Sequence, residues 1–202
     1  MRGSIDEIER VIRDEGIDCD FARGGTVVAA RSPAQWNRAK AEHEDALSWG
    51  QSDVQLLDRD EASARLNAAG TLGATFTPHC AAIHPGRLIH GLAAACERVG
   101  VEIFHRTRAT AVTPGTVTTE HGSLRADVVL RATEGYTGGL PGERRTLAPV
   151  YSLVVATAPL SAAQWSEVGL AHRETFADHR HVIVYGQRTA DDRLVFGGRG
   201  AP

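Results

Sequence analysis

The sequence predicts a mixed α/β (α+β) fold in two interleaved parts, and three observations lead to this prediction. Apolar residues recur at helical spacing in several segments, as at Ile5, Ile8 and Ile12. A predicted helix ends at Gly100 and an apolar run, 101–104, follows with almost no loop, which is typical of α/β layering. The end of the chain instead alternates β-branched and polar residues in short runs, which predicts an antiparallel sheet.

Caps and turns define the elements expected in the first 78 residues. Ser4 and Ser32-Pro33 open helices, because Ser caps a helix N-terminus and Pro fits the first helical turn. Gly24-Gly25 favours a hairpin turn between two strands. We expect a helix over 4–15, strands over 18–23 and 26–31, a helix over 33–49, a strand over 54–57, a short helix over 58–67 and a strand over 72–77.

The middle of the chain changes from helix to strands. Pro85 leads into a helix over 87–99 with one apolar stripe. Pro114-Gly115 and His121-Gly122 are turn pairs that predict a small antiparallel meander. The expected strands are 101–104, the meander 107–112, 116–120 and 123–125, and the buried apolar run Asp127–Leu130, which we expect to be covered on both faces.

After a Gly-rich turn the chain predicts one helix and several strands. Ser161 is the expected N-cap of the helix, over 161–168. The strands are expected over 151–156, 174–177, 181–187 and 194–196. We expect residues 18–77 and 150–198 to share one antiparallel sheet.

Composition and charge exclude several classes of function. A net charge of −3 argues against a nucleic-acid binder, which displays a basic face. The sequence has no signal peptide and no apolar stretch long enough for a membrane span, so we expect a soluble, cytoplasmic protein. No G-x-S-x-G, P-loop or H-E-x-x-H motif supports a hydrolase or a kinase.

The histidines raise the question of a metal site. His179-Arg180-His181 would place two rings on one face of a strand, and His79 and His84 lie elsewhere in the chain. No cysteine or acid pair stands at a recognisable offset to complete a ligand set, so we predict no metal site. His84 before Pro85 instead predicts a helix entry.

Three segments carry a resemblance to a known family. The runs His84–Leu88, Gly91-Leu92 and Gly100–Ile103, followed by Ala126–Thr137 and Arg193–Gly200, resemble the FAD-dependent D-amino-acid oxidase superfamily, especially its glycine-oxidase-like members. The matches cover most of the chain from residue 78 on. The resemblance implies a partial FAD-binding domain over 79–140, interleaved with an antiparallel-sheet substrate domain formed by 1–78 and 141–202.

The chain also departs from the family pattern. The sequence has no strand–G-x-G-x-x-G–helix unit, whose glycines let the FAD pyrophosphate approach a helix N-terminus, and it lacks the C-terminal flavin segment. Glu134 stands where relatives often have Asn, and its carboxylate would repel nearby phosphates. We therefore expect a fragment that binds FAD weakly or not at all as this chain alone, and that is inactive in isolation.

The resemblance also implies site residues. Ala109, Ala132, Thr133 and Gly135 would contact FAD, although Gly135 could also be a loop glycine that supplies a positive φ. Tyr185 and Arg188 would hold a substrate carboxylate, for which the planar fork of an arginine is suited; a solvated arginine at a hairpin edge is the alternative. The flavin does the redox work in such enzymes, so no catalytic residue is predicted.

Two functions follow from this interpretation. The first is part of an FAD-dependent oxidoreductase that oxidises the C–N bond of an amino acid or amine. The alternative is a truncated, catalytically silent module that binds a small molecule or a partner chain without flavin. Surfaces that other family segments cover would be exposed in such a chain, so self-association is also expected.

Overall fold

The computed structural model describes residues 2–199, and the chain divides into two compact units. The first unit comprises Met1–Arg98 and Ser152–Pro202, and the second comprises Val99–Tyr151. The helix Pro85–Arg98 therefore belongs to the first unit by its contacts. The domain boundaries expected at 78/79 and 140/141 follow from the family resemblance, and they stay a prediction.

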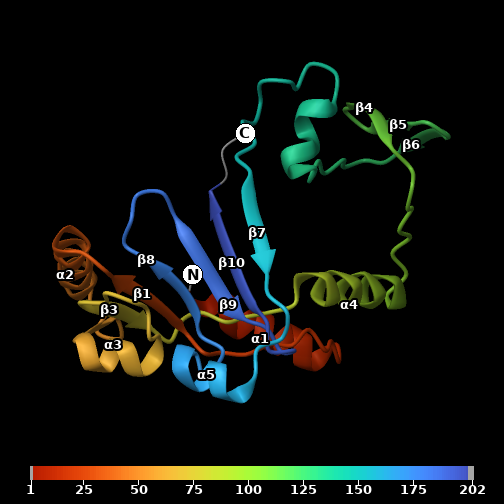
Figure 1. The fold of residues 1–202 in the computed structure, drawn as a ribbon. Helices are drawn as coiled ribbons and strands as arrows, with labels where there is room; N and C mark the ends of the chain where they lie inside the picture. The colour runs from red at the N-terminus through yellow and green to blue at the C-terminus, as the bar shows by residue number, and fades with distance from the viewer. Residues whose placement is uncertain (1, 200–202) are drawn as a thin grey trace. The chain divides into compact units, whose positions relative to one another are not determined.

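A seven-stranded sheet forms the centre of the first unit (Figure 1). Its strand order is β2-β3-β1-β8-β9-β10-β7. The strands are β1 (Thr26–Ala30), β2 (Gln55–Leu57), β3 (Gly73–Thr77), β7 (Ser152–Ala156), β8 (Thr175–Asp178), β9 (Val184–Arg188) and β10 (Leu194–Arg199). The prediction that two distant segments share one sheet is confirmed. The sheet is mixed rather than antiparallel, because β1 and β8 pair in parallel.

Two short helices cover one face of this sheet (Figure 1). They are α3 (Arg59–Arg65), whose N-cap is Asp58, and α5 (Ala162–Val168), whose N-cap is Ser161; both have complete capping boxes. Alternate side chains of the strands point toward these helices. The resulting core contains Val27, Ala29, Leu57, Ala62, Leu66, Ala74, Phe76, Trp165 and Leu170. We call this side of the sheet the core face.

The opposite side of the sheet is covered only in part. The helix α2 (Pro33–Ser48) packs there against β3, since the Trp36 ring lies 2.6 Å from the position that a Cβ on Gly73 would take. The remaining long helices of the first unit are α1 (Arg2–Asp14) and α4 (Pro85–Arg98). The part of this face over β8, β9, β10 and β7 carries the site described below, and we call it the open face.

The hairpin expected over residues 18–31 does not form. Only β1 is a strand, and Ala22 makes an isolated bridge with Ala82. Gly24 and Gly25 pack tightly against other backbone segments instead of forming a turn between strands: a Cβ on Gly24 would lie 2.7 Å from the Glu174 nitrogen. The glycine pair serves close packing, and that prediction was wrong.

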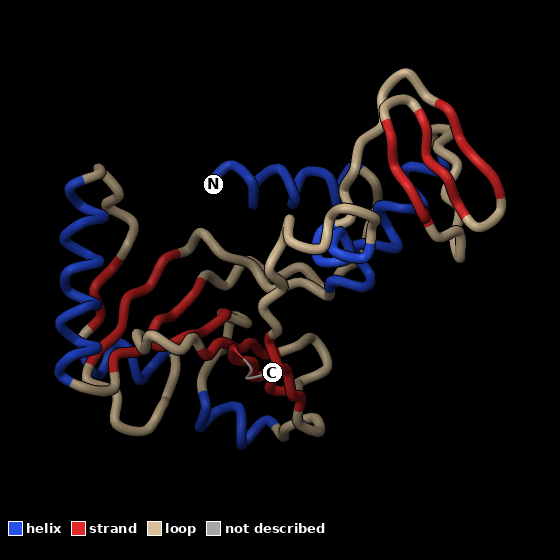
Figure 2. Tube along the Cα trace, turned by 90° about the horizontal axis from the view of Figure 1, so that it is seen from above, coloured by secondary structure: helices blue, strands red, loops and turns tan. Residues whose placement is uncertain are grey.

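The second unit contains a three-stranded antiparallel sheet, whose strands lie side by side in Figure 2. The strands are β4 (Ala109–Thr113), β5 (Thr116–Thr119) and β6 (Gly122–Arg125), which confirms the expected meander. A short 3-10 helix, η1 (Glu134–Gly139), follows.

Two apolar runs of the second unit are not the strands that the sequence predicted. Residues 101–104 and 127–130 are irregular, and Val128 and Leu130 are 81% and 87% exposed. Within residues 2–199 no strand pairs with either run, so their backbone groups have no ladder to join. An apolar run indicates a preference for burial, but a strand also needs a neighbour.

Helix length and hydropathy also bear on membrane insertion. Among the described residues, no helix combines the length and apolar character needed to cross a bilayer.

Candidate functional site

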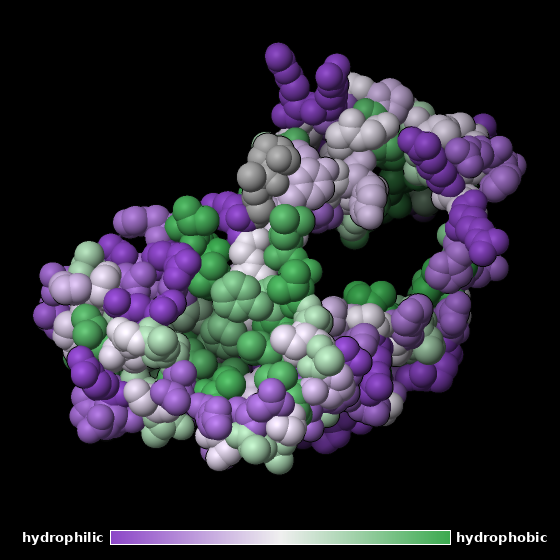
Figure 3. Space-filling view, viewed as in Figure 1, coloured by the Kyte–Doolittle hydropathy of each residue, from purple (hydrophilic) through white to green (hydrophobic). Residues whose placement is uncertain are grey.

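A cavity of about 700 Å³ lies on the open face of the first unit. Figure 3 shows apolar side chains gathered over β9, β10 and β7, where this cavity lies. One row of its wall follows directly from strand register, because paired residues of neighbouring strands share a face. This row contains Thr26, Thr175, Gln187, Val195 and Ala156, from β1 to β7.

A second row of the wall holds the predicted residue Tyr185. Tyr185 pairs with Ala177 of β8 and with Gly197 of β10, and Gly197 pairs with Val154. A Cβ on Gly197 would lie 2.6 Å from the Tyr185 ring, so the ring packs directly against the β10 backbone. A glycine is therefore required at position 197 to leave room for the tyrosine.

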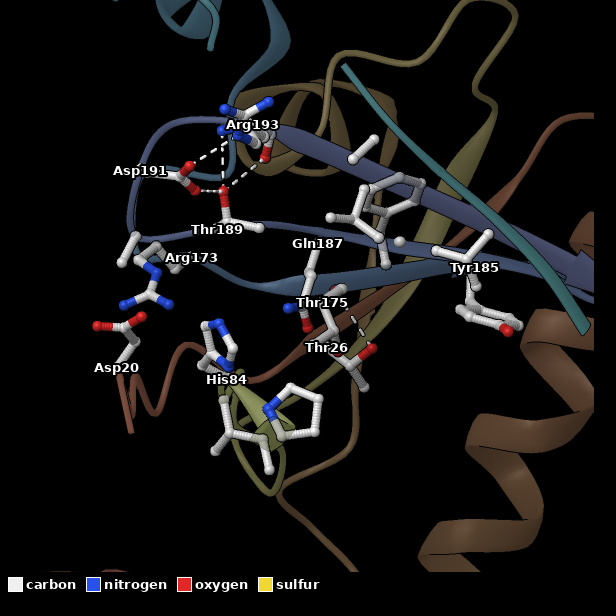
Figure 4. Close-up of a pocket in the computed structure, with 18 of the residues that line it drawn as sticks. Asp20, Thr26, His84, Arg173, Thr175, Tyr185, Gln187, Thr189, Asp191 and Arg193 are labelled. Atoms are coloured by element: carbon white, nitrogen blue, oxygen red, sulfur yellow. Dashed lines mark hydrogen bonds and ion pairs between the residues drawn. The ribbon is translucent and has the colours of Figure 1, made fainter. Parts of the chain in front are cut away.

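A polar network closes one end of the cavity (Figure 4). Thr189 donates its hydroxyl to Asp191 at 2.6 Å, and the Arg193 Nε donates to the same carboxylate at 2.7 Å. The hydrogen bond from Thr189 and then that from Arg193 lower the pKa of Asp191. Asp191 is therefore ionised at neutral pH, and its charge is matched by that of Arg193.

Arg173 lies at the same part of the cavity as Asp20 and His84 (Figure 4). Its backbone has φ +58°, in the left-handed region that residues other than glycine rarely adopt. Its Nε donates a long hydrogen bond of 3.5 Å to the Arg188 carbonyl, and no carboxylate of residues 2–199 pairs with it. The Asp20 carboxylate pairs instead with Arg87 at 2.8 Å.

Arg188 lies on the core face, so the structure does not bring it together with Tyr185. Positions three apart on a strand point to opposite faces. The Arg188 guanidinium lies 4.7 Å from the centre of the Trp165 ring and donates to Asp192 from Nε at 2.9 Å. Arg188 is not a solvated arginine at a hairpin edge either, which was the alternative. This geometry gives no support to the role of carboxylate anchor that the resemblance implied.

The second unit has a separate hollow of about 400 Å³, which two of the predicted FAD residues line. Ala109 and Thr133 line it together with Arg108, Tyr136, Gly139 and Leu140. Ala132 and Gly135 flank Thr133 in the chain but do not line the hollow. The φ of Gly135 is not positive, so a demand for left-handed backbone does not explain this glycine.

The hollow fits only part of an FAD molecule. Its lining supplies the Thr133 hydroxyl, an arginine and apolar carbons, which suit a ring and its sugar. The Glu134 carboxylate accepts a hydrogen bond from the Gly135 N–H, where a phosphate would need a donor. We therefore place no phosphate at this position.

Three of the histidines considered as metal ligands have structural partners. His84 Nδ1 accepts from the Arg87 N–H at 3.3 Å at the start of α4, which confirms its expected place at the helix entry. His79 pairs with Asp53. His179 is buried between the sheet and α2, and burial lowers its pKa. Among residues 2–199, no group of three or more histidine, cysteine or acidic side chains could hold a metal ion.

Comparison with known proteins establishes the family. The family described as DAO, FAD dependent oxidoreductase, matches residues 1–202. The chain belongs to this FAD-dependent family. It is 29% identical over 204 residues to a probable oxidoreductase OrdL of Haemophilus influenzae, covering 96% of this chain and 47% of that protein. It is 27% identical over 195 residues to a gamma-glutamylputrescine oxidoreductase of Escherichia coli, covering 94% of this chain and 45% of that protein.

Two solved enzyme structures have the same fold as this chain. Glycine oxidase from Geobacillus kaustophilus superposes with a TM-score of 0.78 at 18% identity, over 100% of this chain and 54% of that one. L-amino acid deaminase from Proteus myxofaciens gives a TM-score of 0.71 at 16% identity, over 94% of this chain and 43% of that one. The chain thus spans about half the length of these relatives.

Several residues of the cavity were not predicted from the sequence. Thr175 and Gln187 flank the wall that Tyr185 occupies, and Arg173 and Arg193 supply its positive charges. Strand alternation is a signal for Gln187, which lies two residues after Tyr185 and hence on the same face. The loop residue Arg173 has no such signal.

Proposed function

We propose that the chain is part of an FAD-dependent oxidoreductase that oxidises the C–N bond of an amino acid or amine. The observation that carries this proposal is the cavity on the open face, where apolar and hydroxyl-bearing side chains surround Tyr185 and Gln187. A concave, mostly apolar site with a few convergent polar groups is typical of small-molecule binding. The names of two similar proteins, gamma-glutamylputrescine oxidoreductase and glycine oxidase, support an amine or amino-acid substrate.

The side chains of this cavity bind and orient the substrate. FAD, when bound, accepts the electrons that leave the C–N bond, so the redox chemistry belongs to the cofactor. The Tyr185 hydroxyl and the Gln187 amide are positioned to hydrogen-bond a carboxylate or an amine. Val154 and Val195 form an apolar part of the wall that excludes water from the bound substrate. We assign no catalytic acid or base.

We propose that residues of the second unit contact FAD. Ala109 and Thr133 would contact the cofactor within their hollow, and Ala132 and Gly135 would do so from the adjacent backbone. Arg108 lines the same hollow and adds positive charge. These four contacts correspond to the positions that the family resemblance implies.

A catalytically silent module is the second candidate. Leu130 of the second unit and Leu153 of β7 are 87% and 67% exposed, and exposed apolar surface commonly marks an interaction site. Such a module would bind a small molecule or a partner chain, including a second copy, without flavin.

Anaerobic mixing of the chain, in saturating FAD to offset the weak binding expected of residues 1–202, with a panel of amines and amino acids separates the two candidates. Loss of the visible flavin absorbance with at least one compound supports the oxidoreductase. A protein that holds FAD but is reduced by no member of the panel contradicts it. A protein that binds panel compounds while taking up no FAD supports the silent module.

A further inference from the structure

The charges that line the cavity leave one arginine uncompensated. Four ionised side chains reach the wall: Asp20, Asp191, Arg173 and Arg193. Asp191 pairs with Arg193 at 2.7 Å, and Asp20 pairs with Arg87 at 2.8 Å. Arg173 has no carboxylate partner among the described residues. The Arg173 guanidinium is therefore the one charged group of this lining without an ion-pair partner among the described residues, and an anionic group of a ligand can pair with it.

The backbone holds Arg173 in place. Its N–H donates to the Leu170 carbonyl at 3.0 Å, and Leu170 is fully buried in the core. The next residue, Glu174, is 1% exposed, and its carboxylate accepts the His172 N–H at 3.0 Å. Left-handed backbone is unfavourable for an arginine and persists only where the surroundings enforce it. This strained residue lies at a cavity wall, where such strain is often functional.

Arg173 and Tyr185 lie at different ends of the cavity (Figure 4). The Arg173 Nε lies 3.5 Å from the Arg188 carbonyl, and Arg188 is three residues after Tyr185 on β9. Strand residues advance about 3.3 Å each, so the Arg173 guanidinium lies roughly 10 Å along β9 from the Tyr185 backbone. The carboxylate and amine of an α-amino acid share one carbon, so an α-amino acid held at Tyr185 does not span this distance. An elongated molecule with polar groups at both ends can do so.

We propose that Arg173 binds a carboxylate of the substrate at the end of the cavity away from Tyr185. The substrate is then an extended amine or amino acid with an acidic group several bonds from the group held at Tyr185. This inference rests on the proposed function, because it assigns the substrate class of the same cavity. Asp20 and Asp191, at the same end, keep their own arginine partners, Arg87 and Arg193.

Three probes of matched length test this specificity by titration calorimetry with the 202-residue chain. They are 5-aminopentanoate, pentylamine, which lacks the carboxylate, and cadaverine, which has a second amine instead. We expect 5-aminopentanoate to bind about tenfold more tightly than pentylamine, a difference of about 1.4 kcal/mol. Arg173→Gln should remove the difference, Arg173→Lys should retain part of it, and the control Arg59→Gln, at an exposed arginine outside the cavity, should retain all of it.

The outcomes separate the two proposals. Equal binding of 5-aminopentanoate and pentylamine to the wild-type chain, or a preference that survives in Arg173→Gln, overturns the role of Arg173 and leaves the amine site intact. Tightest binding of cadaverine also overturns it, because Asp20 would then dominate. Failure of all three probes to bind overturns the assignment of this cavity as an amine site as well. Circular dichroism of each variant confirms that it is folded.

Discussion

The guanidinium of Arg188 lies over the indole ring of Trp165, on the opposite face of β9 from the side chain of Tyr185. Trp165 is 3% exposed and donates its ring N–H to the Asp192 carbonyl at 3.0 Å, while the Asp192 carboxylate accepts from Arg188. Arg188, Trp165 and Asp192 thus form one cluster that fastens α5 to the end of the β9–β10 hairpin. We expect an arginine held in this way to contribute mainly to stability.

Replacing Arg188 should therefore affect folding more than binding. Arg188→Gln removes a stacked cation and an ion pair, and we expect the free energy of unfolding to fall by about 1–2 kcal/mol. Urea denaturation measures this change, and titration with 5-aminopentanoate measures binding. The matched control Arg193→Gln, on the cavity wall, should lose less stability. A loss of ligand affinity without a loss of stability would instead support the carboxylate-anchor role that the family resemblance implied.

Gly24 should tolerate no side chain. A Cβ there would lie 2.8 Å from the Arg173 carbonyl carbon and 2.7 Å from the Glu174 nitrogen, and both are backbone atoms that cannot rotate away. We expect Gly24→Ala to reduce the free energy of unfolding by about 1–3 kcal/mol and to displace Arg173. Gly139→Ala is the control, because a Cβ there meets nothing within 4 Å. Equal stability of the two variants, in thermal or urea unfolding, would show that the backbone around Arg173 moves at little cost to accommodate the added methyl group.

Stability should depend on pH through His179. Burial lowers the pKa of His179 in the folded protein; Arg38 of α2 acts in the same direction, and Glu42 of α2 and the adjacent Asp178 oppose it. The unfolded chain, with an ordinary pKa of about 6.5, binds the proton more readily. The free energy of unfolding should thus fall as pH drops below about 6.5, and the fall should level off once pH passes the folded pKa.

His179→Gln should flatten this pH dependence below about pH 6.5, as urea denaturation at several pH values would show. The exposed His105 provides the control, and His105→Gln should keep the wild-type slope. An unchanged slope in His179→Gln would mean that another group controls stability in this range.

The polypeptide of residues 1–202 should bind FAD weakly or not at all. The sequence has no glycine-rich phosphate turn, and each lost charge-assisted hydrogen bond costs roughly 1.5–3 kcal/mol. Glu134→Asn should raise the affinity, because it removes a negative charge next to Thr133 of the hollow and so weakens the repulsion of an anionic cofactor. The exposed Glu120→Gln is the matched control. Flavin fluorescence titration measures both, and a wild-type chain that keeps its flavin through gel filtration would contradict the prediction.

Local signals in the sequence predicted most of the helices. The strand pairing could not be predicted in this way, because it joins segments that are far apart in the chain. Ser161 and Asp58 are N-caps whose helices form as expected, because a cap and its partner lie within one turn. The parallel pairing of Thr26 with Thr175 joins residues far apart in the chain, and no local pattern encodes it. The run 127–130 was predicted as a strand from its apolar character alone, without a partner strand.

The candidate site shows the same limit. The family resemblance pointed to Tyr185, which lines the cavity. Strand alternation places Gln187 on the same wall as Tyr185 and Arg188 on the opposite face. Arg173 could not be found in this way, because its position depends on the close approach of Gly24, a contact between distant parts of the chain.

Amide chemical-shift mapping by NMR tests the central claim most directly. The isotope-labelled 202-residue chain would be titrated with 5-aminopentanoate while the shifts of every assigned amide are followed. If the cavity on the open face is the substrate site, the largest changes fall on Thr175, Tyr185, Gln187 and their neighbours on β8, β9 and β10. Changes confined to the hollow of Ala109 and Thr133, or spread over the surface without saturation, would contradict the assignment of this cavity as the substrate site.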